Sequence, residues 1–243
     1  MNPMLEMIRA SVTRFIFPQL CALCDDEVTQ AGLCASCWSD ISLISDMACA
    51  QCATPFGHQQ LHAICGNCLK DPPTFDHAAA AMTYNDGSRQ LLLRFKHGDR
   101  QDIAPVLANM MAPATLPMIN KADFILPLPL HRTRLLARRF NQSAELCRFL
   151  LQRTPEHQHK YNTHILLRHK RTPPQGHKTK AQRRNAMAGA FNVPADQRPM
   201  IKGKHILIID DVMTTGASLS SAANTLKRAG AGIISVAVVA RVC

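Results

Sequence analysis

Hydrophobic and polar positions alternate in blocks along the last two-thirds of the chain. Apolar runs with the length of strands cover residues 75–84, 124–128, 205–210 and 233–240. Between them, apolar residues recur at helical spacing over residues 88–97, 103–111, 141–153 and 218–229. Near-continuous apolar strands alternating with helices are typical of a parallel sheet buried on both faces. The pattern predicts an α/β fold with a mainly parallel sheet flanked by helices, and it leaves residues 154–190 unassigned.

The first 72 residues lack this alternation and carry most of the cysteines instead. Eight of the ten cysteines form four C-x-x-C pairs, at Cys21/Cys24, Cys34/Cys37, Cys49/Cys52 and Cys65/Cys68. A two-residue gap lets both thiolates of a tight turn reach one metal ion, and two such turns complete a tetrahedral zinc site. The sequence therefore predicts two structural zinc sites. Pairing in sequence order is favoured, although the spacing leaves an interleaved arrangement open.

Two other interpretations of the cysteines are less favoured. A disulfide framework is typical of secreted proteins, but residues 1–18 lack the apolar core of a signal peptide. A redox pair would explain one C-x-x-C but not four. A zinc ion held by four thiolates has no open position, so we expect no catalysis there.

The dipeptide Pro72-Pro73 marks the expected domain boundary. We predict a lead segment over residues 1–20, a double zinc ribbon over 21–72 and the α/β domain over 73–243. No apolar run approaches the roughly 18 residues of a membrane span, so no such span is expected.

The positive charge of the chain is concentrated in one segment. The net charge is +11, yet residues 131–184 alone hold 14 Lys and Arg and two acids. This basic segment therefore carries +12, and the rest of the chain is nearly neutral. A solvated face is one explanation, and an anionic partner is the other.

The most informative segment runs from Ile206 to Ser218. A strand leads into Asp210 and Asp211, and the small-residue turn Thr214-Thr215-Gly216 opens a helix. Free backbone N–H groups at such a turn bind anions. The segment lacks the lysine of a Walker A loop, which favours a monophosphate, and the acids suit ribose hydroxyls. The inferred ligand is a ribose 5-phosphate unit.

This D-D-x-x-T-T-G segment is similar to the signature of type I phosphoribosyltransferases, which bind phosphoribosyl pyrophosphate (PRPP) together with Mg²⁺. The resemblance implies that Asp210 and Asp211 bind the ribose. It also implies that the 5-phosphate is bound by Thr214, Thr215, Gly216, Ala217 and Ser218.

Further motifs widen the resemblance. They are Phe95-Lys96-His97-Gly98, Leu126-Pro-Leu-Pro-Leu-His131, Arg138-Arg139-Phe140-Asn141-Gln142-Ser143, Arg171-Thr172-Pro-Pro-Gln175, Arg183-Arg184-Asn185 and Gly189-Ala190-Phe191. With the cysteine pairs, they resemble the ComF/GntX family, in which a zinc module precedes a phosphoribosyltransferase-like domain. The resemblance implies a pyrophosphate or anion site at Lys96, Arg138, Gln142, Gln175 and Arg183. Arg139 stands where the family usually has glycine, so a positive φ there would strain the chain.

Three functions remain open at this stage. The first is a PRPP-binding, phosphoribosyltransferase-like protein acting in competence or the use of taken-up DNA. The second is a non-catalytic single-stranded DNA-binding protein that uses residues 131–184, with PRPP as a regulatory or vestigial ligand. The third is a nucleobase-salvage phosphoribosyltransferase. The resemblance implies a cytoplasmic protein, with other competence or DNA-processing proteins as further partners, and it assigns no catalytic residue or acceptor.

Overall fold

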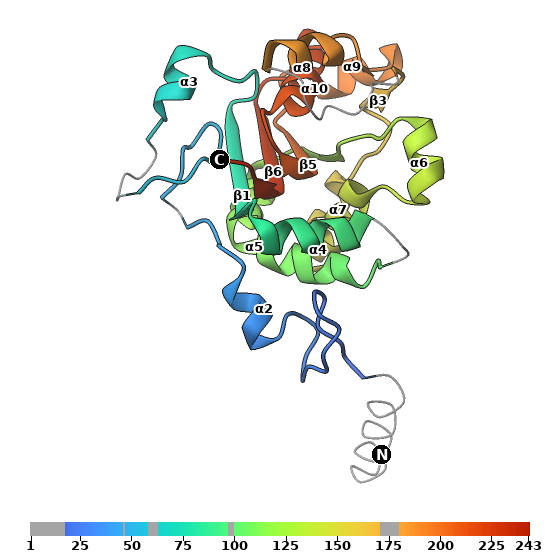
Figure 1. Ribbon diagram of the computed structural model, residues 1–243. Helices are drawn as coiled ribbons and strands as arrows, with labels where there is room; N and C mark the ends of the chain where they lie inside the picture. Colours follow the sequence, from blue (N-terminus) through green and yellow to red (C-terminus); the bar gives the residue numbers. More distant parts are fainter. Residues whose placement is uncertain (1–17, 46, 58–62, 97–99, 171–179) are drawn as a thin grey trace, which may run out of the picture.

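The computed structural model describes residues 18–45, 47–57, 63–96, 100–170 and 180–243, apart from the side chains of residues 180, 181, 183 and 184. Its centre is a four-stranded sheet in the order β1-β6-β5-β2, in which every neighbouring pair is parallel. The strands are β1 (His77–Thr83), β2 (Phe124–Pro127), β5 (Ile206–Met213) and β6 (Ile234–Arg241). The predicted parallel α/β architecture is confirmed (Figure 1).

Helices cover both faces of this sheet. One face packs against α4 (Asp86–Lys96), α5 (Ile103–Lys121) and α7 (Gln142–Gln152). The other packs against α10 (Ala217–Arg228), with α8 (Lys180–Met187), α9 (Arg198–Ile201), η2 (Ala195–Gln197) and the antiparallel pair β3 (Leu167–Arg168) and β4 (Phe191–Asn192) beside it. Along β5, Leu207 and Ile209 face the first layer, whereas Ile206 and Ile208 face the second. Both faces of the strand are therefore buried, which explains its unbroken apolar sequence.

Three elements differ from the sequence expectation. Helix α5 continues to Lys121 through Pro113 and Pro117, beyond the expected end at residue 111, because residues such as Thr115 and Ile119 are buried in its second half. Strand β5 continues past the two acids to Met213. Helix α6 (Arg132–Arg138) was not expected, and since none of its residues is buried, it has no apolar period to detect. A short helix, η1 (Pro155–Lys160), follows α7.

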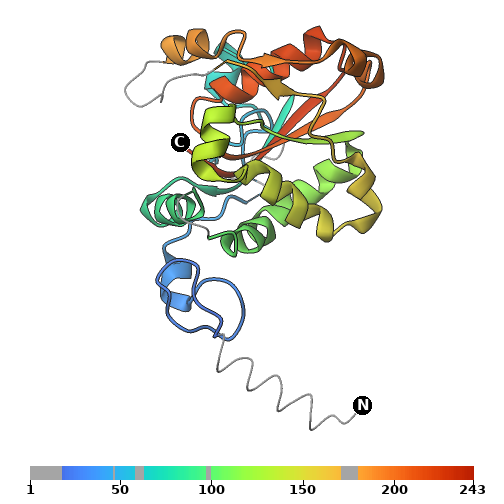
Figure 2. The ribbon, with the colours of Figure 1, turned by 90° about the vertical axis from the view of Figure 1, so that its right-hand side faces the viewer.

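The cysteine-rich segment lies along one edge of the sheet. It contains two short helices, α2 (Ala35–Ser39) and α3 (Gly66–Lys70). Between them, residues 42–44 run antiparallel to β1: Ile44 N donates to Ala81 O (2.9 Å) and Thr83 N donates to Ser42 O (2.9 Å). This pairing covers the otherwise open edge of the sheet. Figures 1 and 2 show that the segment around α2 projects from the body, and Figure 1 shows α3 on the same side of the molecule as β1.

Among the described residues, no helix is long and apolar enough to cross a membrane. The domain limits at residues 20 and 72 stay predictions, and residues 1–17 lie outside the described part of the chain.

Candidate functional site

Two groups of four cysteines each bring their sulfur atoms to one point. Cys21, Cys24, Cys34 and Cys37 form the first ribbon site, and Cys49, Cys52, Cys65 and Cys68 form the second. Within each group the Sγ atoms lie within 4.8 Å of one another, so the cysteines pair in sequence order. The Cys24–Cys34 and Cys52–Cys65 Sγ distances are both 3.6 Å. Four thiolates around zinc at about 2.3 Å would be about 3.8 Å apart, so both groups fit a tetrahedral zinc ion.

Hydrogen bonds in the two ribbons favour the thiolate form of some of the cysteines. Cys34 N donates to Cys21 Sγ and Cys65 N donates to Cys49 Sγ, both at 3.3 Å, so the two sites repeat the same contact. The Ser36 hydroxyl lowers the pKa of Cys34 to about 6. Metal binding requires deprotonated sulfur, and such contacts lower its cost.

The two acids lie at the carboxyl end of β5, where ligands bind in open α/β sheets. Lys96 Nζ, at the end of α4, lies 2.7 Å from Asp211 Oδ2, and both side chains are largely buried. Ser143 Oγ, in the first turn of α7, donates to Asp210 Oδ1 at 3.0 Å. Burial and the neighbouring Asp211 carboxylate raise the pKa of Asp210 to about 7. Three elements distant in sequence thus hold one pair of carboxylates.

The turn after these acids has the geometry of an anion site. Gly216 is the N-cap of α10 with φ of 72°, a left-handed conformation that glycine adopts without strain. Thr215 Oγ1 is buried and has no hydrogen-bond partner among the described residues. The first turn of α10, with Ala217 and Ser218, supplies further N–H groups. Such donors gathered at a helix N-terminus suit a phosphate.

The expected anion residues are only partly brought together. Arg138 Nη1 donates to Gln142 Oε1 (3.1 Å), and Gln142 is buried with its Nε2 atom unpaired within the described structure. Gln175 lies outside the described residues, and so does the side chain of Arg183 on α8. Arg139 has φ of 65°, so the residue in the glycine place does adopt the left-handed conformation.

Sequence reasoning gave no role to two further residues near the acids. Ser143 was seen only as part of a motif. Arg168, on β3, is largely buried over the Phe191 ring, 5.5 Å from its centroid. Burial and the nearby Arg134 lower the pKa of Arg168, whereas Asp210 acts against this shift. Arg168 thus lies within electrostatic range of a second arginine and of one of the acids, which suits an anion such as pyrophosphate. An arginine directly after the apolar run Ile165–Leu167 was the available signal.

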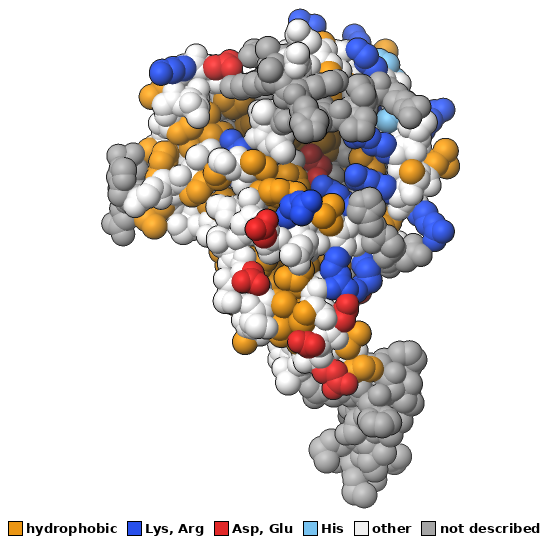
Figure 3. Space-filling view, in the orientation of Figure 1, with side chains coloured by type: hydrophobic (Ala, Val, Ile, Leu, Met, Phe, Trp, Pro, Cys, Tyr) orange, Lys and Arg blue, Asp and Glu red, His pale blue; other side chains and the backbone are white. Residues whose placement is uncertain are grey.

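The surface around the acids is basic. In Figure 3, Lys and Arg side chains gather on the side of α6 and border the central hollow, in which acidic side chains appear. Helix α6 supplies Arg132, Arg134 and Arg138 from the basic segment. This face therefore combines a carboxylate pair with a broad positive rim.

Comparisons with known proteins support both halves of the chain. The family model for a double zinc ribbon domain matches residues 12–69, and that for a phosphoribosyl transferase domain matches residues 156–242. DNA utilization protein YhgH of Escherichia coli O157:H7 is 29% identical over 226 residues, covering 90% of this chain and 95% of that protein. Competence protein ComFC of Bacillus subtilis is 29% identical over 87% of this chain and 90% of its own. The chain therefore carries both domains of the expected family and is similar to its members over most of its length.

The chain is also 28% identical to competence protein F of Haemophilus influenzae, over 86% of its own length and 90% of that relative. The expected family and the order of its two domains are confirmed, and the two four-cysteine groups fit structural zinc. The roles of the individual site residues other than the cysteines are proposals.

Proposed function

We propose that this protein binds PRPP with Mg²⁺ and acts in competence or DNA utilisation. The observation that carries the proposal is the carboxylate pair, Asp210 and Asp211, followed directly by a turn that places the buried Thr215 hydroxyl at the N-terminus of α10. The carboxylates would accept from the 2′ and 3′ hydroxyls of the ribose, and the turn from Thr214 to Ser218 would hold its 5-phosphate. The names of the relatives support the cellular role.

The pyrophosphate would lie over the basic side of the acids. Lys96 contacts Asp211, Arg168 lies within electrostatic range of Asp210, and Arg134 lies within range of Arg168, so three cations are available. Arg138, Gln142, Gln175 and Arg183 are proposed as further contacts from the resemblance. Mg²⁺ prefers oxygen ligands and would neutralise charge on the pyrophosphate when bound with it. Reduced zinc thiolates fit a cytoplasmic location.

Isothermal titration of the full chain with PRPP and Mg²⁺ tests this proposal. We expect saturable binding by the wild-type protein and none by Asp210→Asn/Asp211→Asn. Asp196→Asn, an exposed acid on η2, is the matched control and should bind as wild type. Equal binding by the double variant and the wild type would refute the ribose assignment.

A specific observation favours single-stranded DNA as a second ligand. No residue of α6 is buried, and Lys and Arg side chains gather on this side of the site. The sugar-phosphate backbone of a DNA strand could therefore lie there without any rearrangement of the protein core. PRPP would then be a regulatory ligand. We expect Arg132→Gln/Arg134→Gln to weaken DNA binding in fluorescence anisotropy, and Arg198→Gln to leave it unchanged. Binding that is insensitive to salt between about 50 and 200 mM would contradict a phosphate-backbone interface.

The third function, nucleobase salvage, requires transfer chemistry. The acceptor nitrogen would bond to C1 of the ribose while the C1–O bond breaks, and pyrophosphate would leave with the electron pair. Lys96 and the arginines would stabilise the charge on this leaving group. Pyrophosphate release in the presence of candidate nucleobases distinguishes an enzyme from a binding protein.

A further inference from the structure

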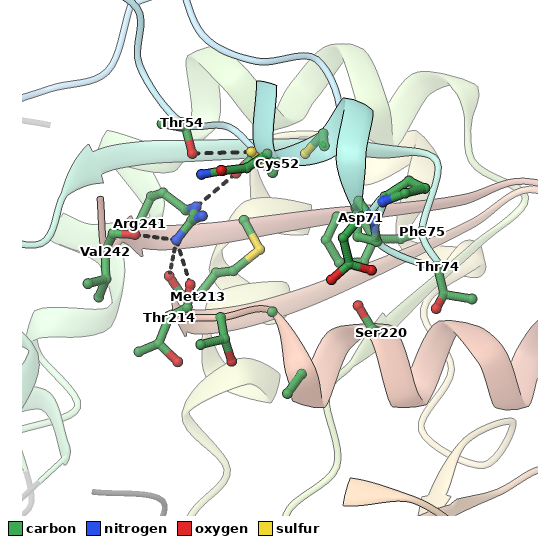
Figure 4. A pocket seen from close by; sticks show the side chains of 17 residues that line it. Cys52, Thr54, Asp71, Thr74, Phe75, Met213, Thr214, Ser220, Arg241 and Val242 are labelled. Atoms are coloured by element: carbon green, nitrogen blue, oxygen red, sulfur yellow. Dashed lines mark hydrogen bonds between the residues drawn. The ribbon is translucent and has the colours of Figure 1, made fainter. Parts of the chain in front are cut away.

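One guanidinium joins the second ribbon to the phosphate turn. Arg241, at the end of β6, donates through Nε to the carbonyl of Cys52 at 2.9 Å. Its Nη1 atom donates to Met213 O at 3.2 Å and to Thr214 O at 2.5 Å, and it also contacts Val242 O. Cys52 is a ligand of the second zinc site, whereas Met213 and Thr214 lead into the turn that would bind phosphate. Figure 4 shows the side chain bridging these two parts.

The ribbon and this turn face each other across a hollow. A crevice of about 460 Å³ separates them; Cys52, Thr54, Asn67 and Cys68 line it on the ribbon side, and Met213 to Ala217 with Ser220 line the other side. Packing contributes through Phe75, whose ring would lie 3.6 Å from a Cβ at Gly216. The guanidinium of Arg241 spans this crevice and connects its two sides directly through hydrogen bonds.

Arg241 helps to fix the direction of the backbone N–H groups, together with Val242 N, which donates to Met213 O at 3.0 Å. A trans peptide is planar, so its N–H points away from its carbonyl oxygen. When the carbonyls of Met213 and Thr214 face Arg241, the N–H groups of Thr214 and Thr215 face the opposite side. That orientation directs both N–H groups toward the side on which an anion would bind.

Zinc in the second ribbon would strengthen the contact between the Arg241 guanidinium and Cys52. Zn²⁺ with four thiolates carries a net charge of −2, whereas four thiols carry none. The guanidinium at Cys52 is therefore attracted more strongly to the loaded ribbon than to the empty one. Zinc also holds the turn that carries the Cys52 carbonyl in place.

We propose that Arg241 is a positioning residue through which zinc in the second ribbon orders the phosphate turn. The ligand whose binding it controls, a ribose 5-phosphate unit, rests on the proposed function, but the order of the turn does not. The first ribbon has a different role, since its contacts reach α4 through Arg94 and Asp25 rather than the turn.

Hydrogen exchange of peptides covering residues 213–222 tests the link without any ligand. In the zinc-loaded full chain, we expect Arg241→Gln to speed exchange there by at least about fivefold. Arg228→Gln, an exposed arginine at the end of α10, is the matched control and should exchange as wild type. Zinc content measured in parallel should remain at two ions for both variants.

Selective loss of each metal provides the second arm. Cys68→Ser should remove one zinc and speed exchange over residues 213–222, whereas Cys37→Ser should remove the other zinc and leave this exchange unchanged. Unchanged exchange in both Arg241→Gln and Cys68→Ser would overturn the inference. If PRPP fails to bind wild type, the proposed function fails, and the exchange results still decide the zinc link.

Discussion

At the scale of single residues, the site depends on contacts that offset the repulsion between neighbouring charges. Two adjacent carboxylates repel each other, and Lys96 and Ser143 each approach one of them. The raised pKa of Asp210 shows that this compensation is incomplete. A ligand that presents hydroxyl donors would complete it, which is the chemistry proposed for ribose.

The titration of Asp210 predicts a pH-dependent stability. Its pKa rises from 3.8 to about 7 on folding, so the folded state binds more protons in this window and stability falls as pH rises through it. Asp210→Asn removes this loss, and its Tm should exceed that of wild type by about 3 °C or more at pH 8, and by less at pH 5. Thermal melts at both pH values provide the measurement, with Asp196→Asn as control. A difference independent of pH would contradict the assignment.

Arg139 predicts a second effect at this scale. A non-glycine residue at φ of 65° costs free energy, so Arg139→Gly should stabilise the protein by about 0.5–1 kcal/mol. Ala137→Gly, exposed within the same helix, should destabilise it by a similar amount, since glycine weakens helix interiors. Urea unfolding compares the two variants. Destabilisation by both would show that the arginine side chain outweighs the strain.

At the scale of elements, periodicity predicted what is buried and missed what is not. Strands β5 and β6 and helices α4 and α10 were expected within a few residues, because one or both of their faces are apolar. Helix α6 and the β3–β4 pair lack that signal, and the end of α5 was obscured by Pro113 and Pro117. The T-T-G turn and the cysteine pairs could be predicted because each motif consists of residues close together in the sequence. The roles of Ser143, Arg168 and Arg241 depend on contacts across at least 27 positions or on burial, which no local pattern encodes.

The junction between α4 and the zinc module predicts a steric effect. A Cβ at Gly87 would lie 2.7 Å from Asp40 O and 2.9 Å from Asp40 Cβ, so Gly87→Ala should force the two elements apart. We expect a loss of about 1–3 kcal/mol in unfolding free energy. Gly66→Ala has open space around it and should cost much less. Equal losses in the two variants would show that this close approach is not tight.

At the scale of the whole molecule, the two modules form one structure rather than two joined by a tether. Residues 42–44 extend the sheet, Arg94 and Arg100 both bind Asp25, and Arg241 reaches Cys52. The charge count gave no hint of this, because the basic segment lies on another side of the domain.

The two four-cysteine groups predict the metal content of the protein. Elemental analysis should find two zinc ions per chain, and Cys24→Ser should retain one. Fewer than two in freshly purified wild type would contradict the two four-cysteine sites.

The strand-like pairing of residues 42–44 with β1 has a consequence for self-association. Without this segment, the N–H of Thr83 and the carbonyl of Ala81 would lie unpaired at the open edge of the sheet. Such edges join with copies of themselves. A chain reduced to residues 73–243 would thus form dimers or larger aggregates under conditions in which the full chain does not. The zinc module then prevents the sheet from associating through its edge. Unfolding of this module would first appear as an increase in particle size.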